Sequence, residues 1–277
     1  MNTQQPEILL SDGNLIPQLG LGVWQASDEQ ARASVYHALQ SGYRHIDTAS
    51  IYKNEQGVGL GITDAGISRD ALFVTTKIWN GDQGLAKTSA ALDASLQRLK
   101  LDYVDLLLIH WPTPKNGLFI ETWQAMIDAK KQGKVRSIGV SNFNPEHLSA
   151  IIEQTGEKPV LNQIELHPLF QRQSLRQFHA DHDIQTEAWS PLGQGKALTD
   201  QTLMSIGEKY QKSAAQIIIR WHLQLGNIVI PKSVTPSRIE ENFNVFDFQL
   251  DESDMSTIAS LDQNLRIGPD PETFYMA

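Results

Sequence analysis

The feature that most constrains the fold of this chain is a regular alternation of short apolar runs with amphipathic segments. Most of the runs are rich in Leu or β-branched residues and almost continuously apolar, which is typical of parallel strands covered on both faces. They lie at Leu19–Val23, which is the weakest, and at Arg44–Asp47, Leu72–Lys77, Val104–His110, Val135–Ser141, Val160–Glu165, Ile184–Trp189 and Ile228–Lys232. Eight strand–helix units of about 28 residues each predict an α/β fold of the (β/α)8 TIM-barrel type.

The segments between the runs carry helix start signals. A side-chain cap followed three residues later by Gln, or directly by Pro, marks the first turn of a helix. Such signals occur at Ser27 with Gln30, Asn144 before Pro145, Ser213 with Gln216, and Thr235 before Pro236. They predict helices after the first, fifth, seventh and eighth strands.

Two further segments lie outside the eight units. Ile8–Leu10 and Leu15–Ile16 flank the Gly-containing turn Ser11–Asn14, which predicts a β-hairpin that closes the bottom of the barrel as a plug. An extra helix at Glu252–Leu261 and a tail loop from Asn264 follow the last unit. We therefore expect residues 1–277 to form a single barrel domain.

The main rival is a doubly wound sheet of the dinucleotide-binding type. That fold requires Gly-x-Gly-x-x-Gly after the first strand. Gly20-Leu21-Gly22 and Gly57-Val58-Gly59 both lack the third glycine at the required position. The pattern therefore favours the barrel.

Composition excludes several classes of function. The chain has no cysteine, so disulfides, thiolate metal ligands and thiol nucleophiles are all absent. Its formal net charge of −9 argues against a nucleic-acid partner, although it permits a local basic pocket. No apolar stretch reaches the length of about 18 residues that spans a membrane, and the N-terminal segment lacks the basic and apolar regions of a secretory signal. We expect a cytoplasmic protein.

Polar and aromatic side chains follow the apolar runs, where a TIM barrel has its active site. These residues are Asp47, Lys77, His110, Ser141, Asn142, Gln163, Trp189, Ser190, Lys232 and Ser233. Tyr52 lies five residues after Asp47, and Trp24, Trp79 and Trp111 also lie at or just beyond strand ends. Each residue alone could be an ordinary core or rim residue. Their occurrence on successive units favours a site.

Four of these residues form a chemically coherent set. The phenol of Tyr52 has an ordinary pKa near 10, and a nearby ammonium group lowers the pKa of a phenol. Lys77, held and kept charged by Asp47, would thus make Tyr52 a usable general acid. His110 would orient a carbonyl group. Because no residue in the set can donate a hydride, a cofactor must supply it.

These residues lie within six longer motifs, which are Ile46-Asp47-Thr48-Ala49, Ile51-Tyr52-Lys53-Asn54-Glu55, Thr76-Lys77-Ile78-Trp79, Leu108-Ile109-His110-Trp111-Pro112, Gly139-Val140-Ser141-Asn142-Phe143 and Ile230-Pro231-Lys232-Ser233. With these motifs, the sequence resembles the aldo-keto reductase family from about residue 7 to the tail, and most closely its bacterial members that reduce 2,5-diketo-D-gluconic acid. Many family members have Tyr where this chain has Trp189. The resemblance implies a carbonyl reductase in which NADPH supplies the hydride without a metal, and Tyr52 donates the proton.

The resemblance also implies a cofactor site. Ser141, Asn142 and Gln163 match positions that hold the nicotinamide carboxamide, and Trp189, followed by Ser190, matches the ring stacked on the nicotinamide. Leu192 and Gly193 belong to the loop over the pyrophosphate. The remaining matches are Lys232, Ser233, Val234 and Arg238 at the adenosine 2′-phosphate, and Glu241 and Asn242 near the adenine ribose and base. A helix start with a lysine, a hydroxyl and an arginine also attracts phosphate on physical grounds, although a solvated basic helix start is the alternative.

For the substrate, Trp24, Trp79, Trp111 and Asn142 are expected to line the pocket, with Phe274 or Tyr275 of the tail closing it. Simple aldehydes, ketoaldehydes such as methylglyoxal, and keto-sugar acids such as 2,5-diketo-D-gluconate all remain candidates. His179 and His182 have helical spacing but no third ligand, so we expect no metal site.

Two alternatives stay open from the sequence. One is a Schiff-base aldolase that uses Lys77 or Lys232 in the same fold. The other is a non-catalytic NADPH-binding sensor on a reductase scaffold. The resemblance further implies a monomer.

Overall fold

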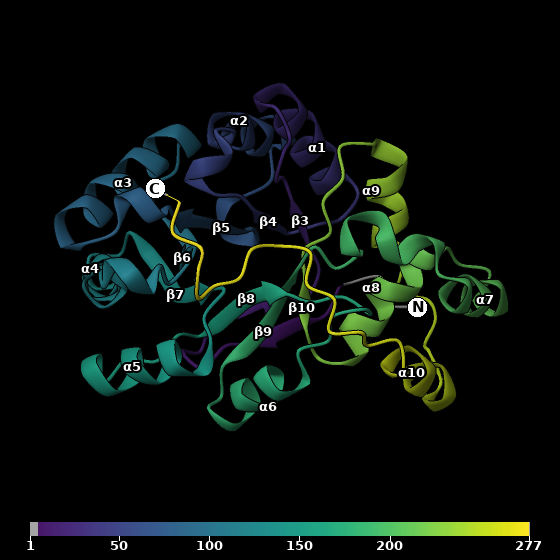
Figure 1. Cartoon of the computed structure of the whole chain (residues 1–277). Helices are drawn as coiled ribbons and strands as arrows, with labels where there is room; N and C mark the ends of the chain where they lie inside the picture. Colours follow the sequence, from purple (N-terminus) through teal and green to yellow (C-terminus); the bar gives the residue numbers. More distant parts are fainter. Residues whose placement is uncertain (1–4, 277) are drawn as a thin grey trace.

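The structure is a computed structural model that describes residues 5–276. Residues 1–4, part of the segment from which we predicted the lack of a secretory signal, lie outside the described residues. Eight parallel strands follow one another around a barrel, in chain order from β3 to β10 (Figure 1). They are β3 (Gly20–Gly22), β4 (His45–Asp47), β5 (Phe73–Ile78), β6 (Val104–Ile109), β7 (Val135–Ser141), β8 (Leu161–Glu165), β9 (Gln185–Trp189) and β10 (Ile228–Val229). Bridges from Leu19 to Val229 and from Gly22 to Lys232 close the barrel, which confirms the predicted TIM-barrel fold.

Helices surround the strands. They are α1 (Asp28–Gln40), α2 (Glu55–Ala65), α3 (Leu85–Leu99), α4 (Phe119–Lys131), α5 (Pro145–Thr155), α6 (Gln173–Asp181), α7 (Gln201–Tyr210), α8 (Ala214–Gln224), α9 (Pro236–Phe243) and α10 (Glu252–Ala259). Short 3-10 helices lie at η1 (Ser50–Tyr52), η2 (Arg69–Ala71), η3 (Asn80–Asp82), η4 (Pro114–Asn116) and η5 (Gly193–Thr199). The predicted caps hold: α1, α5 and α8 each begin with a capping box, and Thr235 is the N-cap of α9.

The glycines of α2 serve close helix packing. A Cβ atom at Gly57 would lie 2.0 Å from the carbonyl oxygen of Asp28, and one at Gly59 would lie 2.2 Å from that of Leu99. The backbone of α2 therefore contacts the start of α1 and the end of α3 without intervening side chains. This packing role explains a Gly-x-Gly sequence that fails the dinucleotide-binding pattern.

The N-terminal hairpin is a plug, as predicted. Strand β1 (Glu7–Leu9) pairs antiparallel with β2 (Leu15–Pro17), with Leu9 opposite Leu15. Leu10 and Ile16 are buried in a separate apolar cluster with the lower-barrel side chains Phe73, Leu106, Leu108, Val160, Leu161 and Ile228. At the other end of the chain, the tail crosses the molecule from α10 toward α3 (Figure 1).

Most strands shift by one residue or so from their predicted bounds, and three larger differences stand out. Strand β10 ends at Val229 rather than Lys232, because Pro231 has no N–H to donate to the ladder. Pairing resumes at the bridge from Gly22 to Lys232, where the Pro231 carbonyl accepts from Gly22 N at 3.1 Å. Helix α10 ends at Ala259, two residues before the predicted Leu261. Helix α7 was not predicted; it begins where Asp200 accepts from the amides of Thr202 and Leu203.

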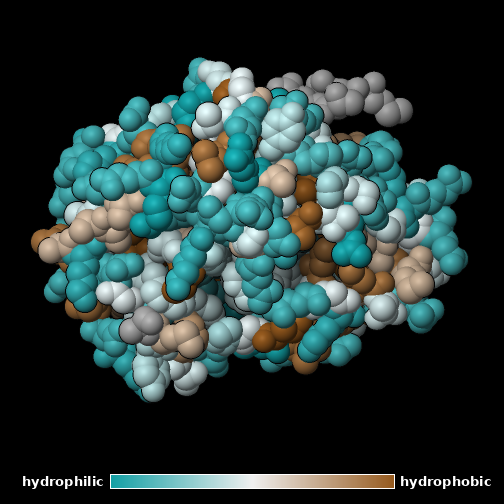
Figure 2. Space-filling view, turned by 90° about the horizontal axis from the view of Figure 1, so that it is seen from above, coloured by the Kyte–Doolittle hydropathy of each residue, from teal (hydrophilic) through white to brown (hydrophobic). Residues whose placement is uncertain are grey.

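The face shown in Figure 2 is mostly hydrophilic, with apolar residues in small groups. Within residues 5–276, every helix is too short or too polar to cross a membrane.

Candidate functional site

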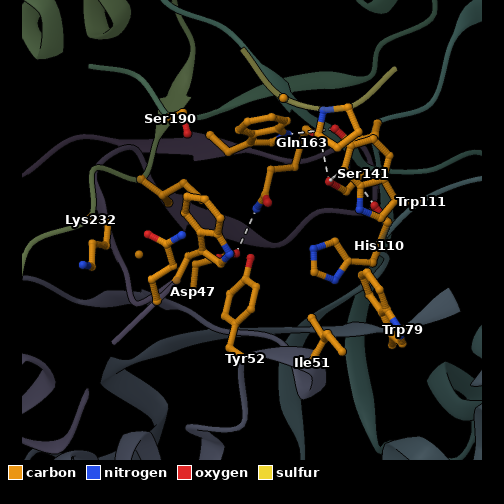
Figure 3. Close-up of a pocket in the computed structure, with 18 of the residues that line it drawn as sticks. Asp47, Ile51, Tyr52, Trp79, His110, Trp111, Ser141, Gln163, Ser190 and Lys232 are labelled. Atoms are coloured by element: carbon orange, nitrogen blue, oxygen red, sulfur yellow. Dashed lines mark hydrogen bonds between the residues drawn. The ribbon is translucent and has the colours of Figure 1, made fainter. Parts of the chain in front are cut away.

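A cavity of about 440 Å³ opens at the carboxyl ends of the strands (Figure 3). It brings together most of the residues that the sequence placed at strand ends, from all eight strands of the barrel or the loops that follow them. The predicted residues that line it are Trp24, Asp47, Tyr52, Trp79, His110, Trp111, Ser141, Asn142, Gln163, Trp189, Ser190 and Lys232. Lys77 is fully buried and lies behind this surface.

Asp47 and Lys77 form a buried ion pair between the neighbouring strands β4 and β5. The Lys77 Nζ donates to Asp47 Oδ1 at 2.5 Å and to the Thr48 carbonyl at 2.9 Å. Burial is the largest single effect and would lower the pKa of Lys77, but Asp47, through its charge and its hydrogen bond, and the other acidic groups nearby together outweigh burial and raise that pKa. Lys77 is therefore a charged ammonium group in the neutral range.

Tyr52 lies on η1, with the Lys77 Nζ 5.2 Å from the centroid of its ring. Enclosure in the site raises the pKa of Tyr52 above its usual 10, and the opposing effect of Lys77 offsets only part of that rise. Our expectation that Lys77 would bring the pKa of Tyr52 below 10 is thus wrong in its net direction, because desolvation is the larger effect. The consequence is a phenol that keeps its proton throughout the neutral range, beside a cation that favours the phenolate once the proton leaves.

His110 follows β6 and meets the ring of Tyr52 edge to face, with centroids 5.7 Å apart. Figure 3 shows the imidazole and the Tyr52 hydroxyl turned toward the same space. Burial, reinforced by Lys77, holds the pKa of His110 well below 6.5. The ring is accordingly neutral at physiological pH, suited to orienting a carbonyl oxygen rather than to donating a proton.

The three residues predicted to hold the carboxamide are joined by hydrogen bonds. Ser141 Oγ donates to the Gln163 carbonyl at 2.8 Å, and Asn142 Nδ2 donates to the His110 carbonyl at 2.9 Å. Asn142 Oδ1 accepts from the indole N–H of Trp189 at 2.8 Å. This last bond fixes the edge of the Trp189 ring, which a phenylalanine at this position could not do.

A second cavity of about 670 Å³ continues from the first. The two share Trp24, Gln25, Ser190, Gln194 and Lys232 in their linings, so one long groove runs from Tyr52 to α9. The predicted residues that line the second cavity are Ser190, Leu192, Lys232, Ser233, Val234, Arg238, Glu241 and Asn242. Gly193 lies outside both linings and is buried, with His167 and Ala197 as its nearest neighbours.

The far end of the groove fits a phosphate group. Lys232 and Arg238 are both exposed, and neither forms an ion pair or a side-chain hydrogen bond within residues 5–276. The first turn of α9 begins beside them at Pro236. Two uncompensated cations next to a helix start can hold an anion, and the length of the groove accommodates a dinucleotide.

The tail forms part of the cavity wall. Of the two aromatic residues considered, Phe274 closes the pocket, with its ring centroid 4.5 Å from that of Trp111. Tyr275 is exposed. The carboxylate of Glu165, at the end of β8, accepts from the amides of Ile267 at 2.6 Å and Gly268 at 2.8 Å, which fastens the tail to the barrel.

Sequence reasoning missed several lining residues. These are Gly22, Gln25, Ile51, Gln194, Ile230, Gly268 and Pro269. Gln25 and Gln194 have left-handed backbones in loops, so no strand or helix pattern marks them. Among the described residues, no group of three or more His, Cys, Asp or Glu side chains could hold a metal ion.

Comparison with known proteins identifies the family. The model of the aldo/keto reductase family matches residues 18–263. An aldo-keto reductase of Mycolicibacterium smegmatis is 57% identical over 97% of this chain and 98% of its own length. Methylglyoxal reductase DkgA of Escherichia coli is 54% identical over 96% and 97%. A solved structure of a Gox0644 mutant in complex with NADPH matches with a TM-score of 0.95 and 48% identity, over 98% and 99% of the two chains. This chain belongs to the aldo/keto reductase family.

Proposed function

We propose that this enzyme reduces small uncharged aldehydes and ketoaldehydes to alcohols, with Tyr52 as the proton donor and His110 orienting the carbonyl. NADP(H) dependence follows from family membership and agrees with the NADPH complex of Gox0644. Methylglyoxal, the substrate in the name of the E. coli relative, is the first compound to test.

The observation that carries the proposal is the difference in protonation between Tyr52 and His110, which line the same cavity. In the neutral range Tyr52 keeps its hydroxyl proton, whereas the imidazole of His110 is uncharged. When bound, NADPH supplies the hydride. Tyr52 passes its hydroxyl proton to the carbonyl oxygen as that oxygen gains charge, and the ammonium of Lys77 stabilises the phenolate that remains. Asp47 keeps Lys77 in place, and neutral His110 can donate a hydrogen bond to the carbonyl without losing its own proton.

The second cavity supports the cofactor half of the proposal. Lys232 and Arg238 would hold the 2′-phosphate, with Ser233 and the start of α9 beside them. Trp189, with its edge fixed by Asn142, offers an aromatic surface to the nicotinamide.

The walls of the first cavity favour uncharged substrates. Its lining includes the large aromatic side chains of Trp24, Trp79, Trp111 and Phe274. The charged side chains in its lining are Asp47 and Lys232, and both are assigned to other roles. A keto-sugar acid would therefore find no dedicated cation for its carboxylate, so we place such substrates second.

The aldolase alternative requires a neutral lysine. Lys77 is held by Asp47 and has a raised pKa, so it cannot attack a carbonyl. Lys232 remains testable by borohydride trapping in the presence of a carbonyl substrate; a covalent adduct at Lys232 would favour that chemistry.

The test of the proposal is Tyr52→Phe. We expect kcat for methylglyoxal reduction to fall by at least about a hundredfold, since a positioned general acid contributes about that much or more. NADPH affinity, measured by quenching of tryptophan fluorescence, should change little, because the ring itself is kept.

Tyr36→Phe is the matched control, since it removes an exposed phenol on α1, away from the cavity. It should leave kcat unchanged. Full activity in Tyr52→Phe would contradict the assignment of the proton donor, and loss of NADPH binding would indicate a structural effect instead.

A further inference from the structure

One buried acid in the barrel has no part in the mechanism above. Glu187 lies on β9, two residues before Trp189, so both side chains lie on the same side of the strand. Its side chain is fully buried. Within residues 5–276, its Oε2 accepts one hydrogen bond, from Gln163, while Oε1 has no hydrogen-bond partner and lies 3.7 Å from His45 Nε2.

Gln163 connects this acid to the catalytic ion pair. Its Nε2 lies 2.8 Å from Asp47 Oδ2 and 2.9 Å from Glu187 Oε2 (Figure 3 shows the bond to Asp47). A primary amide nitrogen carries two hydrogens, and here each has a carboxyl oxygen as its acceptor. The reverse orientation would place the amide oxygen against the carboxylate of Asp47, which can only accept a hydrogen bond.

This arrangement determines what Gln163 presents to the cavity. Gln163 is part of the cavity lining, and its Oε1 accepts no hydrogen bond from the described residues. Because both N–H bonds are directed into the barrel, the side chain offers only an acceptor to a ligand. With Asp47 alone, the second N–H would lack an acceptor and could turn into the cavity.

Glu187 can act in this way without a charge. Burial, together with the nearby charge of Asp47, raises the pKa of Glu187 to about 8. A neutral carboxyl group still has an oxygen that accepts from Gln163. It adds no second negative charge beside the pair of Asp47 and Lys77.

We propose that Glu187 is a positioning residue: it fixes the amide of Gln163 so that its oxygen faces the cavity and selects a cofactor ring whose substituent carries an N–H donor. The carboxamide NH2 of nicotinamide is such a donor. This inference rests on the proposed function, because it requires the dinucleotide to bind in this groove.

The test compares two dinucleotides in three proteins. NADP+ has the carboxamide, whereas its 3-acetylpyridine analogue has a methyl ketone and no N–H. Affinities are measured by tryptophan fluorescence in the wild-type enzyme, Glu187→Leu and Glu187→Gln. We expect the wild type to prefer NADP+ by about tenfold, the value of one hydrogen bond. The preference should fall toward one in Glu187→Leu and persist in Glu187→Gln, whose side-chain oxygen accepts the same hydrogen.

The outcomes separate this inference from the function. A preference that survives in Glu187→Leu, or is absent from the wild type, overturns the role of Glu187 while leaving the reductase intact. Failure of the wild type to bind either dinucleotide refutes the proposed function and this inference with it.

A second measurement covers the case in which Glu187→Leu does not fold, as judged by circular dichroism. In the wild-type enzyme, both side-chain amide protons of Gln163 should exchange slowly with solvent in NMR spectra. Their signals are identified by their loss in Gln163→Met. One rapidly exchanging proton would overturn the proposal, because it would show that Glu187 does not hold the second N–H.

Discussion

At the scale of single residues, two side chains could supply the proton that a carbonyl oxygen takes up. His110 and Tyr52 face the same space, and their ordinary pKa values would favour His110 near neutral pH. Burial reverses that choice, because it lowers the pKa of the imidazole and raises the pKa of the phenol. In the neutral range, the phenol of Tyr52 is protonated and the imidazole of His110 is uncharged.

This difference predicts the pH dependence of the reaction. Between about pH 5.5 and about pH 7.5, kcat for carbonyl reduction should stay within about twofold, because neither group titrates there. If protonated His110 were the donor, kcat would decrease as the pH rises through 6.5. Stopped-flow or steady-state rates at saturating substrate distinguish the two cases.

Stability is the control for that measurement. The folded-state pKa of His110 is depressed, so the stability that it contributes is present above about pH 6.5 and is lost as the pH falls below that value. The unfolding midpoint should therefore be followed at each pH. A decline of kcat at low pH that parallels unfolding carries no information about the donor.

The sequence indicated the four residues that we propose for catalysis, but not the direction in which the pKa of Tyr52 shifts or the role that we propose for Glu187. Strand-end positions follow from the apolar runs, so Asp47, Lys77 and His110 were accessible to reasoning. The direction of the pKa shift of Tyr52 depends on how deeply the phenol is buried relative to the nearby charge of Lys77, and this is set by three-dimensional packing rather than by sequence spacing. Glu187 was missed because a lone acid within an apolar run belongs to no motif, although an acidic side chain on the inner side of a barrel strand is itself a usable signal.

At the scale of elements, the alternation of runs and helices determines the order around the barrel, while the boundaries depend on local chemistry. The caps of α1, α5 and α8 were predictable because they involve residues three positions apart. The early end of β10 also has a sequence cause in Pro231, which the apolar pattern alone did not reveal. The tight packing of α2 required coordinates, because its contacts lie on α1 and α3.

That packing gives a stability prediction. Gly59→Ala should lower the free energy of unfolding by about 2 kcal/mol or more, since the added Cβ would lie 2.2 Å from the Leu99 carbonyl oxygen. In an exposed helix the same change would stabilise by about 1 kcal/mol. Thermal unfolding decides between the two signs, with Gln56→Ala on the exposed side of α2 as the matched control. A raised midpoint in Gly59→Ala would contradict the close approach of the two backbones.

At the scale of the whole molecule, the net charge and the proposed cofactor appear to conflict only if charge is treated as uniform. A chain of formal charge −9 should repel a polyanion. Lys232 and Arg238 are nevertheless exposed at the second cavity and free of ion pairs within residues 5–276. We expect Coulomb attraction at contact distance to exceed the repulsion from charges distributed over the remaining surface.

The salt dependence of NADPH affinity tests whether the two local cations or the net charge of the protein has the larger effect on binding. The screening length falls from about 30 Å at 0.01 M salt to about 10 Å at 0.1 M, so salt weakens distant repulsion first and then contact attraction. If the local cations dominate, NADPH affinity should decrease severalfold between about 0.01 M and about 0.3 M NaCl. If the net charge dominates, affinity should rise over the same range.

Arg238→Ala should flatten the salt dependence of NADPH affinity and weaken the binding of NADPH much more than that of NADH, which lacks the 2′-phosphate. Arg32→Ala is the matched control, because it changes the net charge by the same amount at an exposed residue on α1 that pairs with Asp64. If Arg238→Ala and Arg32→Ala changed NADPH affinity and its salt dependence equally, the net charge of the enzyme would control binding. That result would refute the assignment of Arg238 to the phosphate.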